Sequence, residues 1–376
     1  MKRRLNVGIL LPGFSADEHD WAIPVQQNLV REMAKHADVR VIATRYPHTQ
    51  TPYAVHGAEV YPLGAGAWAR KLARFRLWRD TLRLIRRLHK KRPFDVLHAM
   101  WADETGLLAN WAGKWLNIPV VVSIAGGELV GFKDINYGLQ RSAFSRWTVA
   151  QALYGADAVV VACDYVENLL IQRGYRIPPD KIHTIALGVD TNVFRPDAKV
   201  KTVKNRLIHA ASLVGVKDQA TLLRAVARLP ETELLIIGEG NLRADLQALA
   251  KNLHITQRVT FAGAIHHLEL PRHYQTAALN VLTSRHEGLG MVTLEAAACG
   301  VPTISTHVGL LPDVPEMGVT VPVGDDVALA DAINTLLNDD EKRAELTTSA
   351  RKAIKSTYTI QHTVDDFLQL YRTLIG

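Results

Sequence analysis

The chain has 376 residues, of which 48% are hydrophobic and 22% charged, and this ordinary globular composition excludes a disordered chain. Its length indicates two domains at about 150 residues each, and no apolar run approaches the roughly 20 residues that span a bilayer. Only two cysteines are present, Cys163 and Cys299, so a disulfide framework is excluded and we expect a reducing cytoplasm.

The first half of the chain alternates short apolar runs with helical patterns, which is typical of parallel sheets with crossover helices. The run at 5–11 follows a basic start without a small-residue cleavage site, so it indicates a strand rather than a signal peptide. Further strands are predicted at 39–44, 59–63, 95–98, 120–124, 158–162 and 181–186. Helical patterns occupy 24–36, 69–91, 104–116 and 143–153.

The second half repeats this rhythm after a polar, charged stretch around Pro196, where we place the domain boundary. Strands are predicted at 207–213, 233–237, 259–262, 279–283, 302–306 and 319–323. Helices are predicted at 219–229, 242–252, 291–299 and 327–338, with another after them and an apolar-striped helix at the end of the chain. The fold class is therefore α/β, with two doubly wound domains whose ligands bind beyond the carboxyl ends of the strands. Such an architecture alone names no reaction.

One segment carries the positive charge of the chain. Between Trp68 and Arg92 there are eleven Lys or Arg and one acid, Asp80, a local net of +10 within a total of +7, which leaves −3 for the rest. Apolar residues recur there at steps of three or four: Trp68, Leu72, Phe75, Trp78, Leu82 and Ile85. The basic helix 69–91 suits an anionic membrane surface, but the pattern equally fits a domain helix that packs its stripe on a sheet. Nothing around it supports nucleic-acid binding.

The most informative motif is SRHEGLGMVTLEAAACGVP, residues 284–302. A predicted strand leads into a loop with Glu287, Gly288 and Gly290, and a helix follows that stops at Gly300. The glycines let backbone approach a ligand, and the start of the helix offers N–H groups and a positive dipole end, which suits a diphosphate. Glu287 and Glu295, eight positions apart, can bracket one elongated polyol.

This motif resembles the donor-binding motif of retaining GT-B glycosyltransferases, in particular glycosyltransferase family 4. Segments that resemble the family in the same order cover almost the whole chain, among them PFDVLHAMWADETGLLA, GADAVVVACDYVENLL, IALGVDTNVFRP and LIHAASLVGVKDQATLLRA. The resemblance implies two Rossmann-like domains facing a central cleft, with a C-terminal helix that crosses back to the first domain. The acceptor-binding domain would be 1–196 plus 357–376, and the nucleotide-sugar donor-binding domain 197–356.

The resemblance also implies roles for individual residues. The first Glu of the motif contacts the transferred sugar and the second the ribose hydroxyls, which assigns these roles to Glu287 and Glu295. Lys217 matches the Lys on the diphosphate, so Glu287 and Lys217 are the catalytic candidates. The other donor-binding candidates are Ser212, Gly288, Leu289, Gly290, Met291, Val292, Gly13 and, near the nucleotide base, Gly263 and Ala264. The candidates for acceptor contact follow predicted strand ends: His98, Trp101, Asp103, Gly126 and Glu128. A buried, hydrogen-bonded structural role stays open for His98.

Four positions depart from the family pattern. Ser212 stands where an Arg usually binds the diphosphate, Ala125 replaces a His before Gly126, Leu187 replaces an Asn, and the first loop has the single Gly13 instead of a glycine pair. Losing a charge-assisted donor at 212 costs about 1.5–3 kcal/mol if its hydrogen bond was well made. The donor half therefore matches the family better than the acceptor half.

The implied function is metal-independent, retaining transfer of a hexose from a UDP- or GDP-sugar, without a cofactor or bound metal. The acceptor would be a glycan, lipid-linked or membrane-located if the basic helix 69–91 binds the inner face of a membrane, as in cell-envelope polysaccharide or glycolipid synthesis. Two alternatives stay open: a non-catalytic nucleotide-sugar-binding subunit, and a GT-B enzyme of other chemistry such as an epimerase. The pair His266–His267 lacks metal-ligand spacing and indicates a loop.

Overall fold

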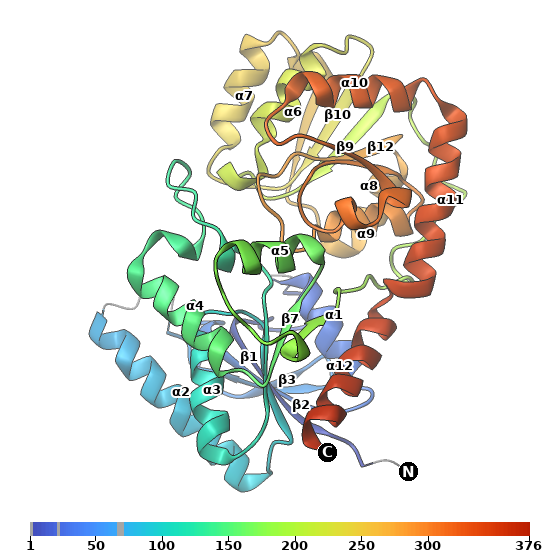
Figure 1. Ribbon diagram of the computed structural model, residues 1–376. Coiled ribbons are helices and arrows are strands. Elements are labelled where there is room, and N and C mark those ends of the chain that lie inside the picture. Colours follow the sequence, from blue (N-terminus) through green and yellow to red (C-terminus); the bar gives the residue numbers. More distant parts are fainter. Residues whose placement is uncertain (1–2, 21–22, 66–70) are drawn as a thin grey trace. The chain divides into compact units, whose positions relative to one another are not determined.

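The computed structural model describes residues 3–20, 23–65 and 71–376, and the chain divides into two compact units (Figure 1). The first unit comprises Met1–Phe132, Gly138–Ala186 and Ile360–Gly376; the second comprises Lys133–Tyr137 and Leu187–Thr359. The division thus falls after Ala186, ten residues before the boundary placed at Pro196 from the sequence. The terminal helix belongs to the first unit, as the resemblance implied.

The first unit is built on an eight-stranded sheet with the order β3-β4-β2-β1-β5-β6-β7-β8. All neighbours are parallel except β3 and β4. The strands are β1 (Asn6–Gly13), β2 (Asp38–Tyr46), β3 (Tyr53–Val55), β4 (Ala58–Pro62), β5 (Val96–Ala99), β6 (Val120–Ser123), β7 (Ala158–Val161) and β8 (Ile182–Thr184). Most residues of its central strands are buried, as expected for a parallel sheet covered by helices on both faces.

The helices of the first unit are α1 (Pro24–Met33), α2 (Lys71–Lys91), α3 (Glu104–Leu116), α4 (Ala143–Gly155), α5 (Asp164–Gln172) and α12 (Ile360–Ile375). Helices α2, α3 and α4 lie side by side on one face of the sheet, and α12 packs against α1 on the other (Figure 1). Right-handed crossovers that move along a sheet in opposite directions place their helices on opposite faces. The chain goes from β1 to β2 in one direction and from β4 through β5 and β6 to β7 in the other, so α1 covers one face and α2, α3 and α4 cover the other.

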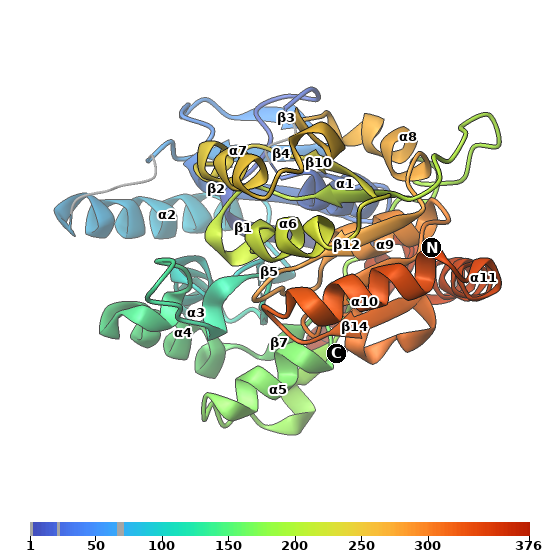
Figure 2. The ribbon, with the colours of Figure 1, turned by 90° about the horizontal axis from the view of Figure 1, so that it is seen from above.

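The second unit is a six-stranded, fully parallel sheet with the order β11-β10-β9-β12-β13-β14. Its strands are β9 (Arg206–Ala210), β10 (Glu233–Ile237), β11 (Val259–Gly263), β12 (Leu279–Leu282), β13 (Thr303–Thr306) and β14 (Gly318–Val321). Its helices are α6 (Gln219–Ala227), α7 (Arg243–Asn252), α8 (Leu270–Gln275), α9 (Met291–Ala298), α10 (Asp326–Leu337) and α11 (Asp340–Thr357). Helices α6 and α10 lie side by side on one face (Figure 2).

The predicted strands and helices are confirmed, with ends that differ by a few residues, except that residues 69 and 70 of the predicted helix 69–91 lie outside the described residues. The helical and strand patterns missed β3 and α8, which are too short to carry a hydrophobic period, and also α5, which lies in the segment GADAVVVACDYVENLL that resembles the family. The starts of α3, α4, α6, α10 and α11 have side-chain caps of the expected kind. Asp103, for example, accepts a hydrogen bond from the Thr105 backbone N–H at 2.7 Å to cap α3.

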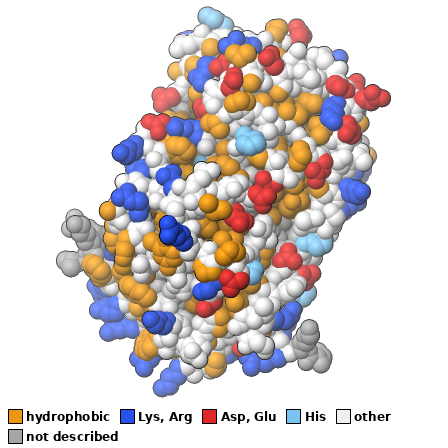
Figure 3. Space-filling view, in the orientation of Figure 1, with side chains coloured by type: hydrophobic (Ala, Val, Ile, Leu, Met, Phe, Trp, Pro, Cys, Tyr) orange, Lys and Arg blue, Asp and Glu red, His pale blue; other side chains and the backbone are white. Residues whose placement is uncertain are grey.

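Helix α2 packs its apolar side on α3 and β2, as expected if the basic segment is a helix of the domain that packs its apolar stripe on the sheet. Its side chains Leu77, Trp78, Leu84, Ile85 and Leu88 are buried. Phe75, predicted in the same stripe, is instead 60% exposed, and Trp68 lies outside the described residues. Lys and Arg side chains gather on this side of the first unit (Figure 3). In the part of the chain that the structure describes, no helix is long and apolar enough to cross a bilayer.

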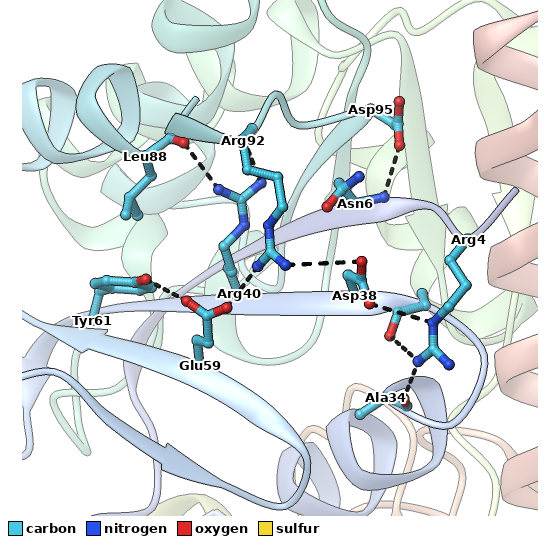
Figure 4. A network of polar contacts seen from close by, with 11 residues as sticks. Arg4, Asn6, Ala34, Asp38, Arg40, Glu59, Tyr61, Leu88, Arg92 and Asp95 are labelled. Atoms are coloured by element: carbon cyan, nitrogen blue, oxygen red, sulfur yellow. Dashed lines mark hydrogen bonds and ion pairs between the residues drawn. The ribbon is translucent and has the colours of Figure 1, made fainter. Parts of the chain in front are cut away.

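A buried arginine fastens the end of α2 to the sheet (Figure 4). Arg40 on β2 donates from Nη1 to the Leu88 carbonyl at 3.1 Å and from Nη2 to the Arg92 carbonyl at 2.8 Å, and its guanidinium lies 3.7 Å from the Phe94 ring centre. Burial and the nearby Arg92 lower the pKa of Arg40 to about 10. Arg40 follows the amino end of β2, so it stabilises the edge of the sheet opposite to the carboxyl ends.

Candidate active site

The second sheet has its switch point between β9 and β12. The chain runs outward from β9 through β10 to β11, and from β12 through β13 to β14 on the other side. The loops after β9 and β12 therefore face each other beyond the carboxyl edge, where doubly wound sheets bind ligands. They are joined by two hydrogen bonds, from the Thr283 hydroxyl to the Lys217 carbonyl at 3.0 Å and from the Arg285 N–H to the Val216 carbonyl at 2.8 Å.

Lys217 and Glu287 meet at this switch point. Lys217 Nζ lies 2.6 Å from Glu287 Oε1, and the Ser284 hydroxyl donates to the same oxygen at 2.5 Å. Burial alone would raise the pKa of Glu287, but the Lys217 ammonium and the two hydrogen bonds outweigh it and lower that pKa below its ordinary value. The structure thus brings together an ammonium and an ionised carboxylate from loops 70 residues apart.

The predicted glycine loop leads directly into α9. Gly290 has a φ of 86°, a left-handed conformation that favours glycine, and it is the N-cap of the helix. Gly288, Leu289 and Gly290 are buried, Met291 and Val292 are half-buried, and the Leu289 carbonyl accepts from the Leu310 N–H at 2.9 Å. The backbone before α9 is therefore held in place, and the first turn of the helix supplies the N–H groups expected to face a diphosphate.

Glu295 turns away from this pair into the interior of the second unit. Its side chain accepts a hydrogen bond from His267 Nε2 at 2.8 Å and one from the Tyr274 hydroxyl at 2.9 Å, and the residue is only 4% exposed. Burial and the Glu295 carboxylate raise the pKa of Tyr274, so its hydroxyl stays protonated as a donor. The ring of Phe194 lies 5.0 Å from that of His267. His267 thus lies in the connection between β11 and α8, as the sequence indicated, but it is buried there and bonds to Glu295, the residue predicted to bind the ribose.

The remaining donor candidates also lie at the carboxyl edge of the second sheet. Ser212 is exposed in the loop after β9, and its carbonyl accepts from the Gln219 amide at 3.0 Å. Gly263 ends β11 with a φ of 79° and is followed by the exposed Ala264. Arg243 lies nearby, donating to the Phe261 carbonyl at 3.2 Å and pairing with Glu239 at 2.5 Å.

The first unit places its own candidates at the switch point between β1 and β5. Gly13 ends β1, so this donor candidate belongs to the first unit. His98 on β5 is fully buried; its Nδ1 lies 2.6 Å from the Tyr371 hydroxyl and its Nε2 2.8 Å from the Ser123 hydroxyl. Burial lowers the pKa of His98 to about 3. The neutral ring thus joins β5, β6 and α12, which is the structural role left open for it, and it presents no surface to an acceptor.

Glu128 fixes the loops that follow β5 and β6. Its carboxylate accepts from the N–H groups of Ala125 at 3.1 Å, Gly126 at 2.7 Å and Ala102 at 3.4 Å, and the residue is 1% exposed. Burial, together with the Asp103 carboxylate, raises the pKa of Glu128 to about 7 against the effect of these N–H groups. Of the acceptor candidates, Glu128 and Asp103 are thus engaged in fixing backbone.

Trp101 and Gly126 are half-buried, so they keep surface for a ligand.

Within the described ranges, no group of three or more His, Cys, Asp or Glu side chains is arranged to hold a metal ion. The sequence analysis gave no role to Tyr274, Arg243 and Glu239, because only the fold brings them to these loops.

Two protein families match the chain: Glycosyl transferases group 1 over residues 190–353 and Glycosyl transferase 4-like domain over residues 23–188. The D-inositol 3-phosphate glycosyltransferase of Mycobacterium avium is 32% identical over 307 residues, which are 76% of this chain and 71% of that protein. The chain belongs to the group 1 glycosyltransferases. Another relative of this glycosyltransferase, the N-acetyl-alpha-D-glucosaminyl L-malate synthase of Bacillus anthracis, is 28% identical over 298 residues, 75% of each chain.

Solved structures show that this glycosyltransferase has the GT-B fold predicted from its sequence. Sucrose-phosphate synthase from Thermosynechococcus elongatus superimposes with a TM-score of 0.80 at 23% identity, covering 99% of both chains. HepE from Anabaena, in complex with UDP and glucose, superimposes with a TM-score of 0.75 at 18% identity, covering 99% of this chain and 100% of HepE.

Proposed function

We propose that this enzyme transfers a hexose from a UDP- or GDP-sugar to a glycan acceptor with retention of anomeric configuration and without a metal ion. The observation that carries the proposal is the meeting of Lys217 and Glu287 at the switch point of the second sheet, beside the start of α9. A cation, an ionised carboxylate and helix N–H groups are the groups needed for a diphosphate that leaves from a sugar.

Each group has a distinct task in this proposal. The Lys217 ammonium exchanges its partner Glu287 for the diphosphate and, with the first turn of α9, stabilises the negative charge that develops as the bond from the anomeric carbon to the diphosphate breaks. Glu287 accepts hydrogen bonds from sugar hydroxyls, and Glu295 accepts them from the ribose while His267 and Tyr274 hold it in place.

Retention follows if the acceptor hydroxyl attacks the face that the diphosphate leaves. The new bond forms between the acceptor oxygen and the anomeric carbon, and the acceptor proton passes to an oxygen of the departing diphosphate. No protein base takes part, so the replacement of the family His by Ala125 is compatible with catalysis. The half-buried Trp101 and Gly126 would contact the acceptor.

The nature of the donor and acceptor is supported more indirectly. HepE, which shares the fold, was crystallised with UDP and glucose, and this makes UDP-glucose the first donor to test. The basic outer face of α2 favours an acceptor on the cytoplasmic face of a membrane, either lipid-linked or part of a membrane-located glycan. Peripheral association would then keep enzyme and acceptor together.

A thermal-shift screen across UDP-, GDP- and ADP-sugars tests the donor site. A ligand at 100 times its Kd adds about 2.7 kcal/mol of stability, so one nucleotide class should raise Tm by several degrees. Lys217→Ala and Glu295→Ala should abolish the shift, whereas Lys352→Ala, which removes an exposed lysine of α11, should preserve it. A shift of wild-type size in the Lys217→Ala protein would contradict the proposal.

Turnover distinguishes an enzyme from a nucleotide-sugar-binding subunit, the alternative favoured by Ser212 and Ala125. Slow donor hydrolysis without acceptor supports catalysis; binding without hydrolysis or transfer supports the subunit, and donor isomerisation would indicate an epimerase. Retention is read from the anomeric proton coupling of the product by NMR, and full activity in EDTA tests independence of a metal.

A further inference from the structure

Apart from Tyr154 near the end of α4, which lies beside Tyr175, five large aromatic side chains of the described residues are exposed on the neighbouring helices α2, α3 and α4. We call them the aromatic platform, and their exposed fractions are 60% for Phe75, 41% for Trp111, 54% for Trp115, 38% for Phe144 and 43% for Trp147. Three of these rings adjoin the buried Trp78, whose ring centre lies 5.5 Å from Phe75, 5.6 Å from Trp111 and 6.2 Å from Phe144, and the ring centre of Trp147 lies 6.0 Å from that of Phe144. Exposed aromatic side chains gathered in this way mark an interaction surface.

Arginines border this platform. The guanidinium carbon of Arg86 lies 4.4 Å from the ring centre of Trp115, and that of Arg74 lies 4.6 Å from the ring centre of Phe144. Arg79 and Arg83 are exposed on the same helix, and α2 contains a single acid, Asp80, which pairs with Arg79 at 2.9 Å. The space-filling view shows hydrophobic side chains beside Lys and Arg on this side of the first unit (Figure 3).

We propose that the aromatic platform docks the enzyme on a bilayer that carries anionic lipids. Trp rings prefer the depth of the lipid headgroups, and arginines beside them reach lipid phosphates, so one surface satisfies both kinds of side chain. Trp78 and Ile85 of α2, which were expected to meet the membrane, are packed inside the unit, so Phe75 of α2 and the aromatic residues of α3 and α4 supply the apolar contact and the arginines of α2 supply the charge. A second copy is a poorer occupant, because a symmetric pair would place two positive surfaces against each other.

Membrane docking rests on the proposed function only for its biological purpose, which is to bring the enzyme and its acceptor together. Lipid binding itself is measured on the full-length protein without donor or acceptor. Flotation with vesicles of phosphatidylcholine and phosphatidylglycerol is compared with flotation on phosphatidylcholine alone. Wild type should bind the anionic vesicles, release at high salt, and float poorly with the neutral ones.

Two variants separate charge from aromatic contact. Arg79→Gln, Arg83→Gln and Arg86→Gln together should weaken partitioning about 100-fold. Trp115→Gln with Trp147→Gln should weaken it about tenfold or more and should also reduce quenching of tryptophan fluorescence by brominated lipids. The matched controls lie on the second unit: Lys352→Gln with Lys355→Gln for charge, and Leu268→Gln for an exposed apolar residue.

Three outcomes would overturn the docking surface: no binding of wild type to anionic vesicles, wild-type partitioning of both platform variants, or a dimer in sedimentation that these variants convert to a monomer. The donor-induced thermal shift serves as the check of folding, and platform variants should retain it. Absent lipid binding with an intact donor shift would refute the platform alone, whereas an absent donor shift with intact lipid binding would refute the proposed function.

Discussion

Removing one hydroxyl, with Tyr274→Phe, tests whether Glu295 is held for a ligand or only buried for stability. Tyr274 and His267 each donate to a different oxygen of the Glu295 carboxylate, at 2.9 and 2.8 Å. Each oxygen of an ionised carboxylate can accept a further hydrogen bond, which is what ribose hydroxyls would use. In Tyr274→Phe the ring and its packing remain, so the change removes one donor with little change in volume.

The expected loss of stability in Tyr274→Phe follows from the burial of Tyr274 and Glu295. A hydrogen bond to a charged group contributes about 1.5–3 kcal/mol, and this one is away from solvent, so the free energy of unfolding of the second unit should fall by about 2 kcal/mol. A carboxylate freed on one side has more rotamers to lose on binding. We therefore expect the Kd for the preferred nucleoside diphosphate to rise about tenfold, which corresponds to about 1.4 kcal/mol.

Calorimetric titration with the nucleoside diphosphate and urea unfolding measure the two quantities on the same protein. The double variant Tyr274→Phe with Glu295→Gln closes a cycle, and a coupling of about 1 kcal/mol in binding is expected. Tyr371→Phe is the matched control, since its buried hydroxyl bonds to His98 in the first unit at 2.6 Å and its loss should lower stability without changing Kd. An unchanged Kd in Tyr274→Phe, with stability lowered in full, would show that the hydrogen bonds to Glu295 serve folding alone.

Three further predictions concern stability. Lys217→Met should destabilise the protein by about 2–3 kcal/mol at pH 7, because Glu287 loses its cation, and by progressively less as the pH falls and that carboxylate takes up a proton; an equal loss in urea unfolding at neutral and at acid pH would contradict this. Glu128, with its pKa raised to about 7, holds its proton in the folded state at pH values where the unfolded chain has already released it. The free energy of unfolding should therefore fall as pH rises from about 4.5 to 7, and Glu128→Gln should flatten that slope in thermal unfolding measured against pH. Arg40→Met should lower the free energy of unfolding by about 3 kcal/mol, since two carbonyls at the end of α2 lose their donors, and wild-type Tm would refute the capping role.

The fold could be predicted because its signal is local and repeated. Each buried strand is a short apolar run, and each crossover helix has its own period, so thirteen strands and their helices could be placed without knowing their neighbours. What could not be placed depends on distant partners. The segment Lys133–Tyr137 lies in the first half of the sequence yet belongs to the second unit, with Asp134 paired to Arg285. No local pattern in five residues reports such a contact.

The candidate site was predictable to the same extent. Lys217 and Glu287 could be named from the resemblance to the family, and the structure brings their side chains together at the carboxyl edge of the second sheet. His98 also ends a strand, but a side chain can point into the sheet as well as beyond it, and its orientation is set by Tyr371 from the far end of the chain. The same limit applies to the stripe of α2: a helical period identifies an apolar side, but whether another helix or a lipid covers it depends on tertiary packing.

The serine at position 212 makes Lys217 more important than its family position alone suggests. Arg243 is a cation at the same edge of the sheet, but its guanidinium is already committed to Glu239 and to the Phe261 carbonyl, so it does not simply replace the missing arginine. The leaving diphosphate would then be stabilised by Lys217 and the start of α9. A serine hydroxyl supplies one neutral hydrogen bond at the position where the family has a guanidinium that can donate two charged ones. Ser212→Arg should accordingly tighten donor binding, and it should restore part of the affinity lost in Lys217→Ala, because the two cations would share one developing charge.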